Sequence, residues 1–188
     1  MMSTSRRNPW TTLSSRIVHD ANPWFRIRED AVTRPDGQPG TYTTLLARRA
    51  VGVVPCFSDG TILLVGQYRY SIARYSWEIP EGGSEDGESP LRTARRELAE
   101  ETGYRAKTYR SLGRFHTSNC FTDETAHLYY ATGLEPGVAR PDGTERLASR
   151  RVPFARACDM AVRGGITDSI TIVALFRLMA RRSARPQR

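Results

Sequence analysis

Residues 82–104 read GGSEDGESPLRTARRELAEETGY, and the second half of this stretch predicts a helix. Ser89 can accept an N-cap hydrogen bond, and Pro90 suits the first helical position because its missing N–H is not needed there. Gly103 stands where a left-handed residue ends a helix. An apolar stripe at helical spacing would hold this helix on a core: Leu91, Ala94 and Leu98.

The same helix carries an acidic face. Glu97, Glu100 and Glu101 stand at i, i+3 and i+4, so their side chains share one side and repel one another. A solvated surface with Arg96 as a local counter-charge is one explanation. A hard divalent cation such as Mg²⁺ or Mn²⁺ is the other, because these ions prefer carboxylate oxygens.

The spacing of these residues favours the cation. The stretch fits the pattern G-x5-E-x7-R-E-U-x-E-E-x-G-U, with U a bulky apolar residue, and by this pattern the chain resembles the Nudix family. Every fixed position is present: Gly82, Glu88, Arg96, Glu97, Leu98, Glu100, Glu101, Gly103 and Tyr104. Weaker similarity to the ADP-ribose and nucleoside-diphosphate-sugar pyrophosphatase branch extends over most of the remaining chain.

The resemblance implies metal-dependent hydrolysis of a nucleoside diphosphate linked to another group. Divalent ions, Mg²⁺ or Mn²⁺, would neutralise the phosphate oxygens and lower the pKa of a bound water. Glu97 and Glu101 are implied as metal ligands, with the backbone carbonyl of Glu81 completing the shell. Glu100 is implied either as a further ligand or as the base that orients the water.

Four further residues are implied to support the catalytic carboxylates. Arg96 and Glu88 would hold the metal ligands in orientation. Gly82 and Gly83 would let the backbone bend close to metal and phosphate.

Two residues before this stretch are candidates for substrate binding. In the ADP-ribose branch an arginine after a strand contacts the substrate diphosphate, and Arg69 matches it; the alternative is a surface strand arginine. Glu78 matches an acidic position of the same branch, and its alternative is a structural hydrogen-bond acceptor.

A polar loop at residues 117–125 offers two more candidates. Its S-N-x-x-T-D-E sequence resembles nucleoside-diphosphate-sugar hydrolases more than strict ADP-ribose enzymes, which typically have a proline in this region. Asp123 or Glu124 could supply a general base, an extra metal contact or a substrate contact. The alternative is that both are turn-forming residues.

The N-terminal segment predicts an antiparallel hairpin, with strands at 24–32 and 41–46. A hairpin alone is barely stable in water, so this one needs a partner surface, and we expect a homodimer built partly from it. In related enzymes such a segment supplies an aromatic face to the base, which makes Trp24 a candidate substrate contact. The alternative is that the aromatic residues here pack in the protomer core: Trp10, Trp24, Phe25 and Tyr42.

The remaining pattern predicts an α/β protein. Strands are expected at 50–57, 61–70, 109–115, 126–132 and 146–152, and helices at 154–163 and from Thr167 or Asp168 to about 181. These elements suit the Nudix-type α/β/α sandwich with a mixed sheet. The expected organisation is a disordered tail at 1–8, the hairpin segment at 9–47, the hydrolase domain at 48–182 and a basic tail at 183–188.

Composition narrows the setting. The chain has 188 residues, a net charge of +8 and no apolar run of membrane-spanning length. Its basic residues concentrate at the two ends without interleaved aromatic residues, which argues against nucleic acid as a partner. Cys56, Cys120 and Cys158 form neither a zinc pattern nor an even disulfide set, and no secretory signal is visible, so we expect a cytoplasmic protein.

These features favour a pyrophosphohydrolase acting on ADP-ribose or a related nucleotide sugar. An RNA 5′-pyrophosphohydrolase or dinucleoside polyphosphate hydrolase is the alternative enzyme. A non-catalytic nucleotide sensor on the same scaffold is the alternative outside catalysis.

Overall fold

The computed structural model describes residues 7–140, 142–143 and 146–184. Most of both tails predicted at 1–8 and 183–188 lies outside these residues. The chain divides into two compact units. The N-terminal unit comprises the chain up to Arg48 together with Ser118–Glu124, and the larger unit comprises Arg49–Thr117 and the chain from Thr125 onward.

The N-terminal unit is a three-stranded antiparallel sheet in the order β1-β2-β3. Its strands are β1 (Thr11–Ala21), β2 (Phe25–Thr33) and β3 (Pro39–Ala47). The predicted hairpin corresponds to β2 and β3, whereas β1 was not expected from the sequence. The sequence of β1, TTLSSRIVHDA, shows no alternation of apolar and polar residues that would have revealed a strand. Nearly every residue of β1 is exposed.

The loop at Ser118–Glu124 is part of this N-terminal sheet structure. Leu45 of β3 donates its N–H to the carbonyl of Phe121, and its own carbonyl accepts from the N–H of Asp123. A parallel bridge also joins Leu45 to Thr122. The segment therefore pairs with β3 although more than 70 residues separate the two in the chain.

The described residues of the larger unit form two sheets and three helices. Its strands are β4 (Ala50–Pro55), β5 (Thr61–Arg69), β6 (Arg74–Glu78), β7 (Glu81–Gly83), β8 (Arg105–His116), β9 (Thr125–Glu135) and β10 (Ala148–Pro153). Its helices are α1 (Pro90–Thr102), α2 (Phe154–Val162) and α3 (Ser169–Ser183), with a 3-10 turn at Tyr70–Ile72. One sheet has the order β7-β4-β9-β8 and is mixed, because β4 runs parallel to β9; the other is β10-β5-β6. The predicted α/β class with a mixed sheet is confirmed.

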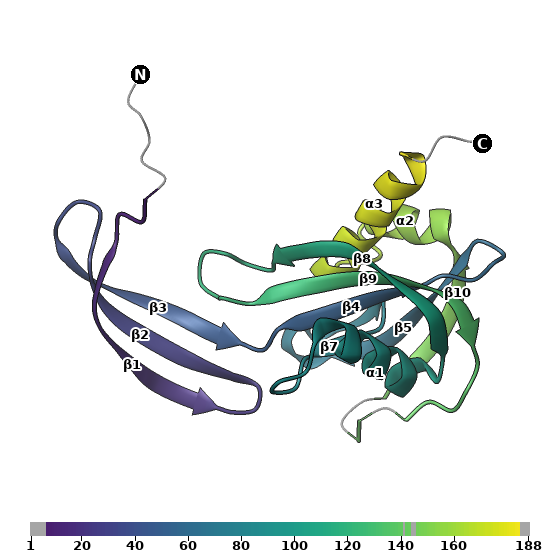
Figure 1. Cartoon of the computed structure of the whole chain (residues 1–188), viewed down its shortest axis with the longest axis horizontal. Coiled ribbons are helices and arrows are strands. Elements are labelled where there is room, and N and C mark those ends of the chain that lie inside the picture. The colour runs from purple at the N-terminus through teal and green to yellow at the C-terminus, as the bar shows by residue number, and fades with distance from the viewer. Residues whose placement is uncertain (1–6, 141, 144–145, 185–188) are drawn as a thin grey trace. The chain divides into compact units, whose positions relative to one another are not determined.

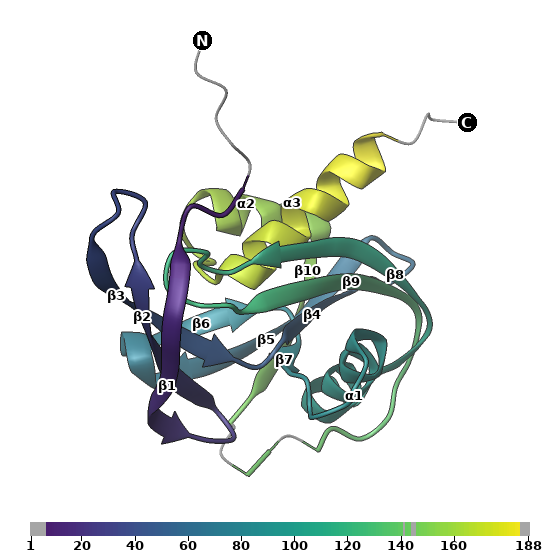
Figure 2. The ribbon, with the colours of Figure 1, turned by 60° about the vertical axis from the view of Figure 1, so that its left-hand side comes forward.

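Strand β4 separates two apolar clusters because alternate side chains of a strand face opposite sides. Val51 and Val53 pack with Ala94 and Leu98 of α1. Val54 faces the other side and joins the larger cluster under α2 and α3. Figures 1 and 2 show α1 on one side of this sheet and α2 with α3 on the other. With both faces covered, β4 is buried along its whole length.

Candidate active site

The helix predicted at the centre of the chain is present and capped as expected. Ser89 accepts a hydrogen bond from the N–H of Arg92, and Gly103 ends α1 with a left-handed φ of 74°. Ala94 and Leu98 are fully buried, whereas Leu91 is only partly buried. Helix α1 is therefore held on the sheet by two of the three residues of the predicted stripe.

The backbone just before this helix is fixed by strand β4. Gly82 pairs with Val51 in the antiparallel β7–β4 ladder, and the N–H of Ser84 donates to the carbonyl of Arg49. On the other side of the unit, the hydroxyl of Thr171 accepts from the N–H of Ile79 over 3.0 Å. The segment from Ile79 to Ser84 is thus anchored both to β4 and to α3.

Arg96 donates hydrogen bonds to three carboxylates of the acidic stretch. One terminal nitrogen donates to Glu97 over 2.8 Å and to Glu100 over 3.0 Å. The other donates to the carbonyl of Gly83 over 2.9 Å and to Glu88 over 3.0 Å. Burial opposes the charge of Arg96, but the surrounding carboxylates outweigh it and raise the pKa of the guanidinium. Arg96 therefore contacts three carboxylates of the stretch, and its role in orienting metal ligands stays a prediction.

Glu88 is itself held by several donors. Its carboxylate accepts from the hydroxyl of Thr93 over 2.9 Å and from the N–H of Glu85 over 3.1 Å. Thr93 is fully buried, and its hydroxyl oxygen lies 2.9 Å from that of Ser84. Glu88 therefore fixes Arg96, which in turn fixes Glu97 and Glu100.

Gly82 allows Glu97 to approach the backbone. A Cβ atom at this position would lie between 2.2 and 2.6 Å from the three carboxylate atoms of Glu97, which is far inside van der Waals contact. Any residue with a side chain would displace the carboxylate. This gives the predicted need for glycine at 82 a specific geometric reason.

A second cluster surrounds Arg69. Its Nε donates to both carboxylate oxygens of Glu78 over 3.0 and 3.1 Å, and a terminal nitrogen also pairs with Glu78. The same terminal nitrogen lies 3.3 Å from the carboxylate of Glu81. Glu78 therefore acts here as the acceptor for Arg69, whose contact with substrate stays a prediction.

Negative charge accumulates around Glu81. Burial raises the pKa of its carboxyl well above the usual range, and the charges of Asp168, Glu78 and Glu101 raise it further, against the opposing effect of Arg69. One of its carboxylate oxygens is buried without a hydrogen-bond partner among the described residues. An accumulation of this kind is what a bound cation would relieve.

Asp168 also belongs to this cluster, which the sequence did not predict. It was expected only as a candidate helix cap, and it does cap α3 by accepting from the N–H of Thr171 over 2.6 Å. Its charge also acts on Glu81 and Arg69. No local signal could show this, because almost 90 residues separate Asp168 from Glu81.

Three predicted site residues belong to the N-terminal unit. The carboxylate of Asp123 accepts from the N–H of Ala47 over 3.0 Å, a long-range contact that ties the loop to β3. The N–H of Glu124 donates to the hydroxyl of Thr122, and Trp24 is 70% exposed. The catalytic and substrate roles of Asp123, Glu124 and Trp24 stay predictions.

The sequence of the chain matches models of known protein families. A family model described as NUDIX domain matches residues 46–168. The chain belongs to the Nudix family. A second model, described as nucleoside diphosphate sugar hydrolase N-terminal domain, matches residues 10–45, so the Nudix match follows it directly.

Individual Nudix relatives cover most of the chain. It is 36% identical to an ADP-ribose pyrophosphatase of Mycobacterium tuberculosis (strain ATCC 25618 / H37Rv), over 90% of this chain and 83% of the relative. It is 35% identical to a methanol dehydrogenase activator of Bacillus methanolicus, over 80% and 82%. A solved structure titled "Crystal structure of ADP compounds hydrolase" superposes with a TM-score of 0.86 at 23% identity, covering 98% of this chain and 99% of that one. This last likeness shows the shared fold.

Nudix hydrolases generally use a divalent metal, for which the carboxylates of this chain are the candidate ligands. Among the described residues, no three His, Cys, Asp or Glu side chains are arranged to hold an ion, and Arg96 engages Glu97 and Glu100. The donor chemistry fits nonetheless: carboxylate oxygens suit hard cations, and Glu81 has a buried oxygen without a partner. Glu97 and Glu101 are both buried. They stand one helical turn apart, on the same side of α1.

None of the helices among the described residues has the length and apolar content needed to span a bilayer.

Proposed function

We propose that this chain hydrolyses the diphosphate bond of nucleoside diphosphate sugars, ADP-ribose among them, to a nucleoside monophosphate and a sugar phosphate. The observation that carries this proposal is the complete carboxylate network around Arg96, with every charged residue of the Nudix pattern in place. The matched N-terminal domain of nucleoside diphosphate sugar hydrolases and the ADP-ribose pyrophosphatase relative support the substrate class.

Glu97, Glu101 and Glu81 are the residues that would hold the divalent metal, which we propose is Mg²⁺ or Mn²⁺. When bound, such an ion supplies charge neutralisation at the diphosphate and lowers the pKa of a coordinated water. Arg96 keeps Glu97 in one orientation, so the ligand does not have to be ordered when substrate arrives.

Glu100 is the best-placed candidate for the general base. Its side chain is 43% exposed, whereas that of Glu97 is 10% exposed, so Glu100 is the more accessible to water. The carboxylate would take a proton from the attacking water while the bond from phosphorus to the bridging oxygen breaks. The proton then leaves Glu100 for solvent, and two phosphate monoesters are released.

Arg69 is proposed to bind the diphosphate. Its planar guanidinium is already ordered by Glu78 and Glu81, which fixes the direction in which any further N–H points. A guanidinium ordered in this way loses little freedom when it binds a phosphate oxygen.

We also propose that the chain forms a homodimer through the N-terminal unit. This three-stranded sheet exposes large apolar side chains, Leu13 at 64%, Ile17 at 45% and Val18 at 47%. Exposed apolar surface of this extent is a common mark of a protein interface.

A substrate panel tests the proposed reaction. Purified protein with Mg²⁺ is offered ADP-ribose, GDP-mannose, UDP-glucose, NADH, a dinucleoside polyphosphate and 5′-triphosphate RNA, and products are separated by chromatography. We expect nucleotide sugars to be cleaved fastest, with activity abolished by EDTA and restored by excess Mg²⁺. Faster cleavage of the RNA or the dinucleoside polyphosphate would contradict the proposal.

The same assay tests the ligand residues. Glu97→Gln and Glu101→Gln each remove a carboxylate charge, so kcat should fall by several orders of magnitude while the fold persists. Glu85→Gln is the control, because Glu85 lies exposed in the same stretch and only its backbone is engaged. Near-normal turnover of either helix variant would rule out the ligand assignment.

A further inference from the structure

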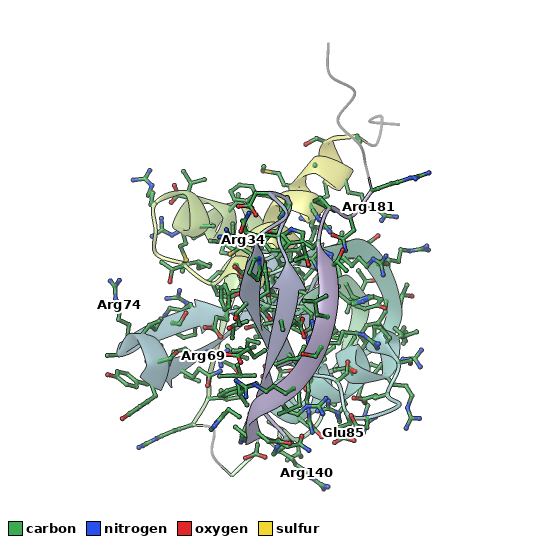
Figure 3. The ribbon with its side chains drawn as sticks, turned by 90° about the vertical axis from the view of Figure 1, so that its left-hand side faces the viewer. Arg34, Arg69, Arg74, Glu85, Arg140 and Arg181 are labelled. Atoms are coloured by element: carbon green, nitrogen blue, oxygen red, sulfur yellow. The ribbon has the colours of Figure 1, made fainter. Side chains whose placement is uncertain are left out.

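A basic hollow of about 500 Å³ lies beside the C-terminal half of α1 in the larger unit. Its walls come from three separate elements. Arg95 belongs to α1, Arg105 begins β8, and Arg140 ends the segment 137–140 that follows β9. Figure 3 shows Arg140 at the molecular surface. Arg96 and Glu100 also line the hollow, so it adjoins the carboxylates described above.

Of the charged residues that line the hollow, four are arginines and one is a carboxylate, Glu100, which pairs with Arg96. Among the residues that the structure describes, none of Arg95, Arg105 and Arg140 forms an ion pair with a carboxylate. Arg95 lies over the ring of Tyr109, 5.7 Å from its centroid. Like charges brought together in this way repel, and an anion between them would offset the repulsion.

Backbone contacts hold the segment 137–140 against the end of α1, although the segment has no regular structure. The N–H of Arg140 donates to the backbone carbonyl of Glu100 over 2.7 Å. Gly103 and Gly137 let the two backbones touch: a Cβ at Gly103 would lie 2.8 Å from the carbonyl oxygen of Gly137, and a Cβ at Gly137 would lie 2.7 Å from that of Gly103. The backbone that carries Arg140 is thus held beside the end of α1 before any ligand arrives, which lowers the entropy cost of binding one.

A structural role for these arginines would be to offset the negative end of the α1 dipole, because the last turn of α1 contains no basic residue. That role needs cations near the terminal carbonyl groups and predicts an effect on stability alone. It gives no reason for a hollow of ligand size between guanidinium groups. Ligand binding and stability can therefore be measured separately.

We infer that this hollow binds a phosphate monoester dianion. The inference rests on the proposed function, because that reaction converts a diphosphate diester into two phosphate monoesters, each able to carry a second negative charge. Guanidinium groups bind such a terminal phosphate through paired hydrogen bonds. The hollow would then retain a product beside the site that formed it, and free inorganic phosphate, which has the same chemistry, would compete for it.

Calorimetric titration without divalent metal, in EDTA, tests the inference independently of turnover. The probes are adenosine monophosphate, ribose 5-phosphate, inorganic phosphate and, as the uncharged reference, adenosine. We expect saturable binding of at least one phosphate probe, none of adenosine, and a Kd at least tenfold weaker in Arg105→Gln/Arg140→Gln. Arg110→Gln is the control, because Arg110 is exposed on the same strand outside the hollow.

The probes separate the two sources of phosphate. Binding of either ester in preference to inorganic phosphate identifies a retained product, whereas equal or stronger binding of inorganic phosphate identifies the free ion. No saturable binding to the wild-type chain, or an unchanged Kd in the double variant, would overturn the inference. If the double variant fails to fold, Arg95→Gln alone must weaken binding for the inference to stand.

The two proposals can fail separately. A chain that cleaves nothing in the substrate panel but binds phosphate through Arg105 and Arg140 refutes the proposed reaction and retains the anion site. A chain that cleaves nucleotide sugars and binds none of the phosphate probes retains the reaction and refutes the anion site.

Discussion

Arg96 shows how one residue sets the geometry of an acidic site. Without it, Glu97 and Glu100 would repel each other on the same side of α1. Its donors link these carboxylates to Glu88 and to the carbonyl of Gly83, so helix and preceding strand are held as one assembly. The helix alone explains why the acids share a face, and Arg96 explains why they keep one orientation.

Gly82→Ala should separate activity from stability. The new methyl group would displace the carboxylate of Glu97, which is the movable end of a side chain, and the backbone could remain in place. We expect kcat to fall by at least tenfold, with a change in the free energy of unfolding of about 1 kcal/mol or less. Steady-state kinetics and urea denaturation check both parts.

Wild-type kcat in Gly82→Ala would show that the position of Glu97 is not critical for turnover. A large loss of stability would instead show that the strand, and not only the carboxylate, had moved.

Arg69→Lys should weaken the use of nucleotide sugars although the charge is kept. Lysine cannot reproduce the paired hydrogen bonds that Arg69 makes with Glu78 while also reaching Glu81. Loss of one charge-assisted hydrogen bond should raise the transition-state free energy by about 1–3 kcal/mol, so kcat/KM should fall roughly 5- to 150-fold. Initial rates on two nucleotide sugars measure it.

Arg74→Lys is the matched control, because Arg74 pairs with Arg69 across the β5–β6 ladder but is exposed. If Arg69→Lys behaves like this control on every nucleotide sugar, the diphosphate role of Arg69 is wrong.

At the scale of elements, burial decided which predictions succeeded. Strand β4 and helix α1 were predicted because one is continuously apolar and the other carries caps and an apolar stripe. Strand β1 was missed because its exposed residues show no periodicity. Strand β7 has only three residues, Glu81–Gly83, and is defined by its pairing with β4. A segment this short has no local pattern from which a strand could be predicted.

The contact between α3 and β4 depends on Gly52. A Cβ there would lie 2.6 Å from a methyl carbon of Ile170 and 2.9 Å from the terminal carbon of Ile79. Gly52→Ala should therefore destabilise the fold by about 1–3 kcal/mol through overpacking, measured by urea denaturation.

The control for this change is Gly143→Ala, because a Cβ at Gly143 meets no described atom within 4 Å. It should change the free energy of unfolding by about 0.5 kcal/mol or less. Equal effects of the two substitutions would mean that the helix does not press on the strand at Gly52.

At the scale of the whole molecule, the proposed homodimer makes a direct prediction. Light scattering at micromolar concentration should give twice the mass of the chain. Leu13→Lys/Ile17→Lys should shift the mass toward that of the monomer, because each lysine places a charge on an exposed apolar position of the N-terminal unit. Val162→Lys is the control, since Val162 is 72% exposed in the larger unit. A monomer mass for the wild-type chain would refute the dimer.

The sequence revealed the acidic stretch because those residues lie within one short segment. It did not reveal groupings drawn from distant segments. Asp168 acts on the Glu81 cluster from the start of α3, and Arg105 and Arg140 line one hollow only because β9 returns the chain to the end of α1. Such groupings depend on topology, and no periodicity within a segment contains that information.

The pairing of Ser118–Glu124 with β3 limits how this chain can be divided. Residues 7–48 look like a self-contained cassette in the linear sequence, but Leu45 and Ala47 depend on hydrogen bonds from a segment far downstream. A chimaera that exchanges only the first 48 residues would combine β3 of one protein with the 118–124 loop of another, so the two sides of this pairing would no longer match. Chimaeras between relatives should therefore tolerate joint replacement of the cassette and the 118–124 loop better than replacement of either piece, so the two are expected to have been inherited together.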